Sequence, residues 1–233
     1  MPVAIITGAS KGLGRALAVA LAGRGWDLVL DARGAQALAK TAEAVSAGGA
    51  RVSALPGDVT DAGHRAELVA AAWRLGGVDL LVHNASALGA EPLVGLEELP
   101  LDGLRRALEV NLVAGLGLVQ EALPLLRASR PGGAVVAVSS DAAAEAYETW
   151  GGYGASKAAL DQLMAVLAVE EPGLRVWAVD PGDMATDLYA AAVPEDREPR
   201  PEPEAVVPGF LRLLDERPVS GRYGAPALLD GAR

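Results

Sequence analysis

The chain has 233 residues, no cysteine, two histidines and a formal net charge of −10. Without cysteine, a disulfide scaffold, a thiolate metal cluster and a cysteine nucleophile are excluded, and two histidines are too few for a typical zinc site, so we expect no metal. The negative charge argues against nucleic acid and anionic lipid as partners. We see neither an export signal nor an apolar run long enough for a membrane helix, and we expect a cytoplasmic protein. The length favours a single domain over residues 1–233.

Short apolar runs alternate with longer amphipathic segments along the chain. Strands are predicted at Val3–Ile6, Leu28–Leu30, Val52–Leu55, Val78–Val82, Ala134–Val138, Leu174–Val179 and Tyr223–Leu229. Helices are predicted at Gly12–Gly23, Ala35–Ala47, Asp61–Leu75, Leu104–Ala128, Gly154–Glu170 and Pro203–Glu216. Most strand runs are unbroken, as in strands covered on both faces. This alternation predicts an α/β fold of the Rossmann type, a doubly wound three-layer αβα sandwich with a mainly parallel seven-stranded sheet.

One linker-like stretch, residues 194–203, reads PEDREPRPEP. It is rich in proline and in charge, so we expect a flexible, solvated loop. It is either a plain surface loop or a flap over a site, and the choice depends on where the chemistry lies.

A glycine-rich motif, Thr7-Gly-Ala-Ser-Lys-Gly-Leu-Gly14, follows the first predicted strand and opens the first helix. Glycines allow the tight turn and the close approach of the backbone to a pyrophosphate, and the helix N-terminus offers free N–H groups to that anion. A glycine trio alone could be only a turn, but its place after an N-terminal strand favours a nucleotide site. The candidate binding residues in this motif are Gly8, Ser10, Lys11, Gly12, Leu13 and Gly14.

The most informative pentad runs from Tyr153 to Lys157 and reads YGASK. Residues four apart on a helix share a face, so the ammonium of Lys157 can lie near the phenol of Tyr153. A nearby positive charge favours phenolate and lowers a tyrosine pKa from about 10 toward the working pH, which would make the phenol a general acid/base for a carbonyl or an alcohol. An isolated pentad of this kind is more often a partly buried tyrosine beside a solvated lysine.

Further motifs stand at the ends of predicted strands, where parallel sheets present ligand-facing groups. In chain order they are Asp58-Val59-Thr60, His83-Asn84-Ala85-Ser86, Ser139-Ser140 and Pro181-Gly182 with Thr186. Asn111 lies within a predicted helix, and Ser140 comes thirteen residues before Tyr153. From Thr7 to Thr186, the order, spacing and placement of these motifs resemble the short-chain dehydrogenase/reductase family, in its compact single-domain branch.

The resemblance implies a role for each matching residue. Tyr153 would exchange a proton with the substrate oxygen, and Lys157 would lower the pKa of Tyr153 and bind the nicotinamide ribose. Ser140 would hold the substrate oxygen, and Asn111 would anchor a water that relays protons from Lys157. Other residues would bind the cofactor: Asp58 and Val59 near the adenine, Asn84 and Ala85 after the fourth strand, and Pro181, Gly182 and Thr186 at the nicotinamide.

Two positions depart from the family's Asn-Asn-Ala-Gly pattern, because His83 replaces Asn and Ser86 replaces Gly. We expect the turn to survive with altered hydrogen bonding. His83 is interpreted as a satisfied histidine at a strand end, and His64 as a residue at the start of a solvated helix. Tyr147 competes with Tyr153 for the role of the reactive phenol, but no lysine follows it four residues later.

The end of the second strand bears on the choice of cofactor. An acid at this position binds the 2′-hydroxyl of NAD and repels the 2′-phosphate of NADP. The resemblance places Ala32 there, followed by Arg33, as in NADP-preferring members, and Lys11 supplies a second cation. Asp31 comes one residue earlier, so its side chain should point to the other face. We expect NADP(H), with NAD(H) as the alternative, because a one-residue slip would reverse the preference.

The predicted substrate is a small carbonyl or alcohol compound. In the resembled family the region after Thr186 covers the substrate, which favours a flap at residues 194–203. The alternative to an oxidoreductase is a catalytically silent NADP(H)-binding regulator of the same fold. A nucleotide-sugar epimerase would need a larger C-terminal domain than this chain has room for. The resemblance also implies a homodimer or homotetramer formed through two long helices.

Overall fold

Seven parallel strands form one sheet in the computed structural model, which describes residues 1–130 and 132–229. The strand order is β3-β2-β1-β4-β5-β6-β7, and every neighbouring pair is parallel. The strands are β1 (Val3–Ile6), β2 (Asp27–Ala32), β3 (Val52–Pro56), β4 (Leu80–His83), β5 (Ala134–Val138), β6 (Arg175–Asp180) and β7 (Gly221–Gly224). The predicted parallel seven-stranded sheet is therefore confirmed.

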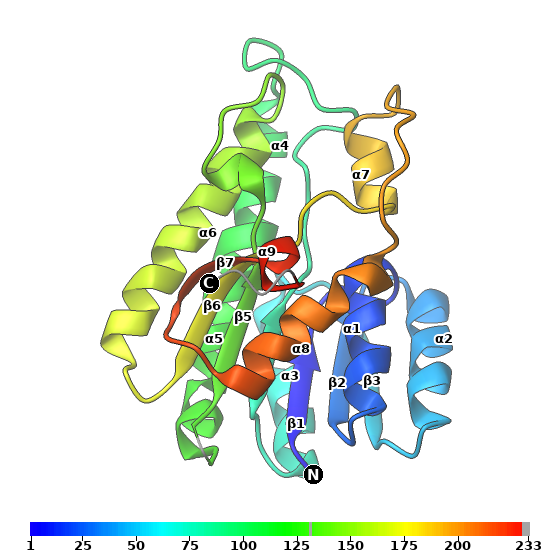
Figure 1. Ribbon diagram of the computed structural model, residues 1–233, viewed down its shortest axis with the longest axis vertical. Helices are drawn as coiled ribbons and strands as arrows, with labels where there is room; N and C mark the ends of the chain where they lie inside the picture. Colours follow the sequence, from blue (N-terminus) through cyan, green and yellow to red (C-terminus); the bar gives the residue numbers. More distant parts are fainter. Residues whose placement is uncertain (131, 230–233) are drawn as a thin grey trace.

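Helices cover both faces of the sheet (Figure 1). One face packs against α1 (Gly12–Ala22), α2 (Ala35–Ser46) and α8 (Val207–Glu216), and the other against α3 (Ala62–Leu75), α5 (Ala114–Ala128) and α6 (Gly151–Glu170). Successive residues of β1 alternate between two apolar cores, because neighbouring side chains on a strand point to opposite faces. This arrangement confirms the predicted three-layer αβα sandwich.

The direction of winding changes at the centre of the sheet. The chain builds β1, β2 and β3 outward on one side, then returns to place β4 on the free edge of β1. The carboxyl ends of the strands face the upper half of Figure 1, where α4 (Leu101–Leu108) and α7 (Asp187–Ala192) lie. A doubly wound sheet binds its ligands in the crevice at such a switch point.

Two predictions about the elements were wrong in detail, and one helix was missed. The predicted helix at Leu104–Ala128 is α4 followed by a π-helical turn, η1 (Glu109–Val113), and by α5. The predicted last strand at Tyr223–Leu229 is a strand only at its start, since β7 gives way to α9 (Ala225–Leu229). Pro226 is the second residue of α9, and proline is tolerated in a first helical turn, where backbone N–H groups need no helical partner. The short helix α7 was not predicted.

The continuous helical segment Leu101–Ala128 has an 18-residue window with a mean hydropathy of 1.3, so it is long and apolar enough to cross a membrane by length and composition. The expectation that no such run exists was therefore wrong. Within this fold, Leu118, Ala122 and Leu126 are fully buried against the sheet. The core helix of a globular protein passes the same test.

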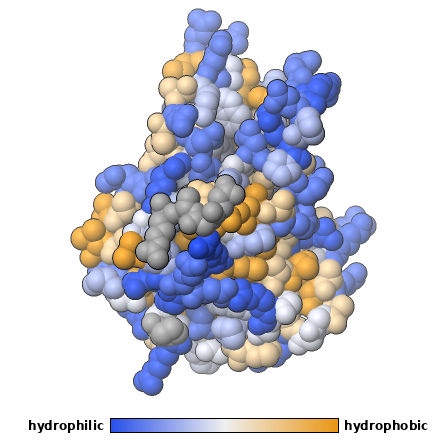
Figure 2. All heavy atoms as spheres, in the orientation of Figure 1, coloured by the Kyte–Doolittle hydropathy of each residue, from blue (hydrophilic) through white to orange (hydrophobic). Residues whose placement is uncertain are grey.

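The face of the molecule drawn in Figure 2 is largely hydrophilic, with hydrophobic spheres at its left edge, where α6 lies in Figure 1. Val166 and Val169 on this helix are 43% and 80% exposed. Such a face is one that the homodimer or homotetramer implied by the resemblance would cover. The oligomer stays a prediction.

Candidate functional site

A cavity of about 670 Å³ opens over the carboxyl ends of the strands. It is lined from the loops that follow β1 to β6, so both halves of the chain contribute to it. The predicted site residues that line it are Gly8, Ser10, Lys11, Gly12, Leu13, Arg33, Asp58, Val59, Asn84, Ala85, Ser140, Tyr153, Lys157, Pro181, Gly182 and Thr186. The other two predicted residues, Gly14 and Asn111, lie behind its wall.

The glycine-rich loop between β1 and α1 is packed too closely for side chains. Gly8 has a φ of +65°, and a Cβ there would come within 3.0 Å of Asn84 and of the backbone of Ala85. A Cβ on Gly14 would lie 2.5 Å from the carbonyl oxygen of Gly8, so Gly14 supports the loop from behind. The N-cap residue of α1, Lys11, makes no side-chain capping bond, so the first amides of the helix are open to an anion. This cradle fits the pyrophosphate of a dinucleotide.

Asp31, at the end of β2, is among the residues that line the cavity, but its carboxylate points to α3 on the other face of the sheet, as predicted. The Asp31 carboxylate is 2% exposed and lies 2.7 Å from Nε2 of His64. It also accepts a hydrogen bond from the backbone of Gly8, although burial still raises its pKa. Ala32, which the resemblance places at the position of the ribose-binding acid, ends β2, and the exposed Arg33 follows on the cavity wall.

His64 was predicted at the start of a solvated helix: it does lie in the first turn of α3, but the expectation that it is solvated was wrong. Its side chain is buried on the sheet side of α3, where it reaches Asp31 of β2. Asp61 caps the helix and accepts a hydrogen bond from the backbone amide of His64, which fixes the start of α3.

Asp58, after β3, is fixed by a residue that sequence reasoning missed. Arg106 of α4 donates a hydrogen bond of 2.8 Å to its carboxylate and also lines the cavity. Burial acts to raise the pKa of Asp58, but hydrogen bonds from Thr60 and Arg106 hold it at about 2. The two residues are 48 positions apart in the chain, and no local pattern pairs them.

The turn after β4 survives its departures from the family pattern. The side chain of Asn84 donates to the carbonyl oxygens of Thr7 and Gly8, and the amides of Asn84 and Ala85 both donate to the Thr7 hydroxyl at 3.0 Å. His83 is buried with Nε2 3.1 Å from the carbonyl oxygen of Asn111, which agrees with its interpretation as a satisfied histidine. Burial and the charge of Lys157 lower the pKa of His83 to about 4.

Tyr153 and Lys157 lie one turn apart on α6, with the ammonium 5.5 Å from the centre of the phenol ring. The Lys157 ammonium donates to the carbonyl oxygen of Val138 at 2.7 Å, and burial lowers its pKa to about 8. The expected lowering of the Tyr153 pKa is not found. Burial raises it to about 12, and the nearby polar side chain of Ser86 acts against this rise. Trp150 packs edge-on against the phenol, with ring centres 5.7 Å apart.

Asn111 lies in the π-helical turn η1 and is fully buried. Its side-chain oxygen accepts hydrogen bonds from the Ala87 amide at 2.8 Å and the Ser86 hydroxyl at 3.2 Å. Its side-chain nitrogen donates to the Ala87 carbonyl and to the Ser156 hydroxyl. The side chain therefore joins η1 to the loop after β4 and to α6, in a type of turn that is frequent at functional sites.

Two serines follow β5 beside Tyr153. The Ser140 hydroxyl donates to Asp141 at 2.9 Å and accepts a hydrogen bond from the amide of Ala142. The Ser139 hydroxyl is buried on the cavity wall and has no hydrogen-bond partner within the described part of the chain. A buried orphan hydroxyl at a cavity wall is open to a ligand atom, which also fits a bound cofactor.

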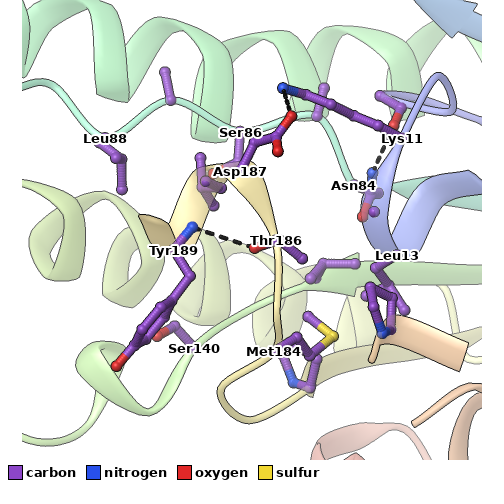
Figure 3. A pocket seen from close by; sticks show the side chains of 18 of the residues that line it. Lys11, Leu13, Asn84, Ser86, Leu88, Ser140, Met184, Thr186, Asp187 and Tyr189 are labelled. Atoms are coloured by element: carbon purple, nitrogen blue, oxygen red, sulfur yellow. Dashed lines mark hydrogen bonds and ion pairs between the residues drawn. The ribbon is translucent and has the colours of Figure 1, made fainter. Parts of the chain in front are cut away.

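The far side of the cavity is formed by the chain after β6 (Figure 3). Thr186 caps α7 by accepting a hydrogen bond from the amide of Tyr189, and Asp187 forms an ion pair of 2.6 Å with Lys11. Arg200, in the stretch 194–203, donates to the hydroxyl of Tyr189 and to Asp196. These contacts place the proline-rich stretch beside α7, and its Glu202 and Pro203 line the cavity.

The fold and site together define a class of protein. A glycine cradle at the switch point of a parallel sheet binds a dinucleotide. A buried tyrosine and lysine, with a serine beside them, stand over the same cavity. This arrangement is that of a dinucleotide-dependent oxidoreductase.

The comparison with protein families identifies the branch of this class. The family model described as short chain dehydrogenase matches residues 2–197. The chain therefore belongs to the short-chain dehydrogenase family of NAD(P)-dependent oxidoreductases.

Individual relatives differ in the compounds in their names. A glycine betaine reductase of Emericella nidulans is 39% identical over 80% of this chain, which spans only 15% of that protein. An NAD(P)+ L-rhamnose 1-dehydrogenase of Sphingomonas is 33% identical over 97% of this chain and 85% of its own length. An alcohol dehydrogenase from Thermococcus sibiricus, solved with 5-hydroxy-NADP, is 29% identical with a TM-score of 0.86, over 96% of this chain and 95% of that one.

Proposed function

We propose that the protein is an NADP(H)-dependent oxidoreductase that reduces a small carbonyl compound to an alcohol. The observation that carries this proposal is that Ser140, Tyr153 and Lys157 line the same cavity as the glycine cradle. A bound dinucleotide and a bound substrate would therefore share one space, as hydride transfer requires.

The state of Tyr153 favours the direction of reduction. With a pKa raised to about 12, the phenol keeps its proton at neutral pH and is ready to donate it to a carbonyl oxygen. The Ser140 hydroxyl would hold the same oxygen as negative charge develops on it. Lys157, held by the Val138 carbonyl beneath the phenol, would hydrogen-bond the ribose of the nicotinamide. Asn111 would act from behind the wall, by holding η1 against the loop after β4.

The residues around the cradle support NADP(H) as the cofactor, which would supply the hydride. The pyrophosphate would be held by Gly8, Ser10, Gly12 and Leu13, and the adenine by Asp58 and Val59. The adjoining part of the cofactor would be held by Asn84 and Ala85. The nicotinamide would be held by Pro181, Gly182 and Thr186. Arg33 would meet the 2′-phosphate. The Asp31 carboxylate, although Asp31 lines the cavity, is 2% exposed and bonded to His64, so it would be poorly placed to repel that phosphate. The NADP derivative bound by the Thermococcus sibiricus enzyme agrees with this assignment.

The substrate would lie between Tyr153 and α7, where Trp150 and Tyr189 line the cavity. Residues 194–203 would cover it as a flap. The sugar and betaine named for two relatives differ in shape and charge, so we extend only the shared chemistry of a small carbonyl or alcohol compound to this chain. The silent regulator is disfavoured because a protein that only binds nucleotide would not need this group of hydroxyl and amino side chains.

Turnover of a panel of ketones and aldehydes with NADPH tests the proposal. We expect Tyr153→Phe to lower kcat by about 100-fold or more, because it removes the acid and leaves the ring in place. Tyr147→Phe is the matched control, since Tyr147 is an exposed phenol bonded to Glu145, and it should leave the rate unchanged. Full activity in Tyr153→Phe would refute the mechanism. A wild-type protein that binds NADPH and turns over no compound would favour the regulator.

A further inference from the structure

Arg222 lies in β7, the strand at one edge of the sheet, opposite Ala178 of β6. It comes after residue 197, where the match to the family model ends. Its side chain is 38% exposed and is not part of the cavity lining, yet it reaches the backbone of Ser140 in the loop after β5. Arg222 therefore contacts the proposed site from outside its wall.

The guanidinium of Arg222 joins the loop after β5 to helix α6. Its Nη2 donates to the backbone carbonyl oxygen of Ser140 at 2.8 Å, and its Nε donates to Oδ2 of Asp161 at 3.0 Å. Asp161 lies on α6, the helix that carries Tyr153. A guanidinium suits this place because its planar fork donates to two acceptors in fixed directions at once. The side chain therefore fixes the backbone of Ser140 relative to this helix.

The other contacts of these acceptors do not replace this link. The Ser140 carbonyl also accepts a hydrogen bond from the amide of Ala143 at 3.1 Å, but Ala143 belongs to the same loop. The carboxylate of Asp161 is 17% exposed, and its Oδ1 is buried with no hydrogen-bond partner among the described residues. Without Arg222, the loop would lose this bonded link to α6, and a largely buried carboxylate would lose its counter-charge.

Arg222 also faces the end of β6. Its Nη2 lies 3.6 Å from Oδ2 of Asp180, and the other carboxylate oxygen of Asp180 accepts a hydrogen bond of 2.9 Å from the amide of Gly182. Gly182 belongs to the turn that would hold the nicotinamide. The guanidinium therefore contacts both the loop that would hold the substrate oxygen and the acid that supports the nicotinamide turn.

We propose that Arg222 is a positioning residue, whose guanidinium holds the backbone of Ser140 against α6 so that the Ser140 hydroxyl meets the substrate oxygen beside the phenol of Tyr153. This inference rests on the proposed function. In the reduction, the proton of Tyr153 passes to the carbonyl oxygen while the carbonyl carbon takes the hydride that the cofactor supplies, and Ser140 donates to the same oxygen. Because both donors must reach one atom, a small shift of the loop relative to the helix slows the reaction without removing either group.

A double-mutant cycle tests this inference, with NADPH and the panel ketone or aldehyde that the wild type reduces fastest. Arg222→Ala should lower kcat by about 10- to 100-fold, the size expected for misplacement of a reacting group. The Kd for NADPH should stay unchanged, because the glycine cradle is not touched. In a Ser140→Ala background the same substitution should lower kcat by less than about three-fold, since no hydroxyl is left to position. Equal losses of kcat in the two backgrounds would overturn the inference.

Arg212→Ala is the matched control for the loss of a structural arginine. Arg212 is 37% exposed and donates to the carbonyl oxygen of Leu228 at 2.6 Å and to Glu216 at 2.7 Å. It lies on α8, outside the cavity lining, so its removal should leave kcat unchanged. An equal loss of kcat in Arg212→Ala would assign the effect to general destabilisation and overturn the inference.

A second variant keeps the test decisive if Arg222→Ala fails to fold. Asp161→Asn combined with Arg222→Ala removes the uncompensated carboxylate and still leaves the Ser140 carbonyl without its guanidinium, so the same cycle carries the same two outcomes. Failure of the proposed function is distinguishable, because it would appear as retained activity in Tyr153→Phe or as no turnover by the wild type.

Discussion

At the scale of single residues, His83 is a neutral base enclosed beside a cation. It is 2% exposed, and burial together with the charge of Lys157 lowers its pKa to about 4, below the usual 6.5. The unfolded chain therefore binds a proton between pH 6.5 and pH 4 that the folded protein rejects, and the free energy of unfolding must fall as the pH falls through this window.

We expect His83→Asn to remove most of this loss, which amounts to about 3 kcal/mol for a shift of this size. Urea unfolding at pH 7 and at pH 4 measures it. The wild type should lose clearly more stability than the variant between the two conditions, since asparagine does not titrate there and can still donate to the Asn111 carbonyl. An equal loss in both proteins would show that other groups control acid unfolding.

Residues of the site could be predicted from the sequence where they belong to a local sequence motif. The placement of Tyr153, Ser140 and the glycine loop on one cavity follows from strand ends and helix spacing. The protonation of Tyr153 does not follow, because its pKa depends on burial and on Ser86, which comes from another loop. The burial of His64 was missed for the same reason, since its partner Asp31 lies 33 positions away.

At the scale of elements, the glycine loop and α7 are joined across the mouth of the cavity by Lys11 and Asp187. Both side chains are mostly exposed, at 66% and 75%, so the ion pair contributes less than about 1 kcal/mol to stability. It nevertheless holds a cation that would otherwise be free to meet a cofactor phosphate. If Lys11 meets a cofactor phosphate as proposed, the pair would compete with NADPH for its ammonium.

Asp187→Asn should leave Tm nearly unchanged and tighten NADPH binding by up to about five-fold, with the gain fading at high salt. Titration calorimetry at low and high ionic strength measures this gain. Asp102→Asn is the matched control, because it breaks an equally exposed ion pair with Arg105 on α4. Weaker NADPH binding in Asp187→Asn would instead show that α7 must be clasped to the loop for the cofactor to bind.

Elements with a strong apolar period were predicted within a few residues, and β1 and β5 agree at both ends. The predicted element bounds were wrong where one apolar pattern in the sequence spans two different kinds of secondary structure. The π turn at Asn111 interrupts an unbroken helical pattern, because its cause is the contact of Asn111 with the loop after β4 and with α6. The apolar residues of α9 likewise resemble a strand in sequence, and packing against α8 decides their helical form.

At the scale of the whole molecule, the two halves of the sheet meet along a single pair of central strands, β1 and β4. The cavity lies over this junction and draws Gly12 from the first half and Tyr153 and Thr186 from the second. A dinucleotide bound there would touch both halves at once. Because such a ligand binds the folded chain and not the unfolded one, it should stabilise the whole fold.

NADPH at 100 times its Kd should add about 2.7 kcal/mol of stability, which raises Tm by roughly 5–10 °C in a chain of this size. NADH at the same concentration should raise Tm less, because it lacks the phosphate that Arg33 would bind. Arg33→Ala should reduce the NADPH shift to that of NADH and leave the NADH shift unchanged, whereas Arg74→Ala, exposed on α3 and outside the cavity, should alter neither. Equal Tm shifts for the two nucleotides in the wild type would refute the NADP(H) preference but would still support a dinucleotide site. Thermal-shift measurements on the wild type and the two variants therefore separate the choice of cofactor from the binding of a cofactor.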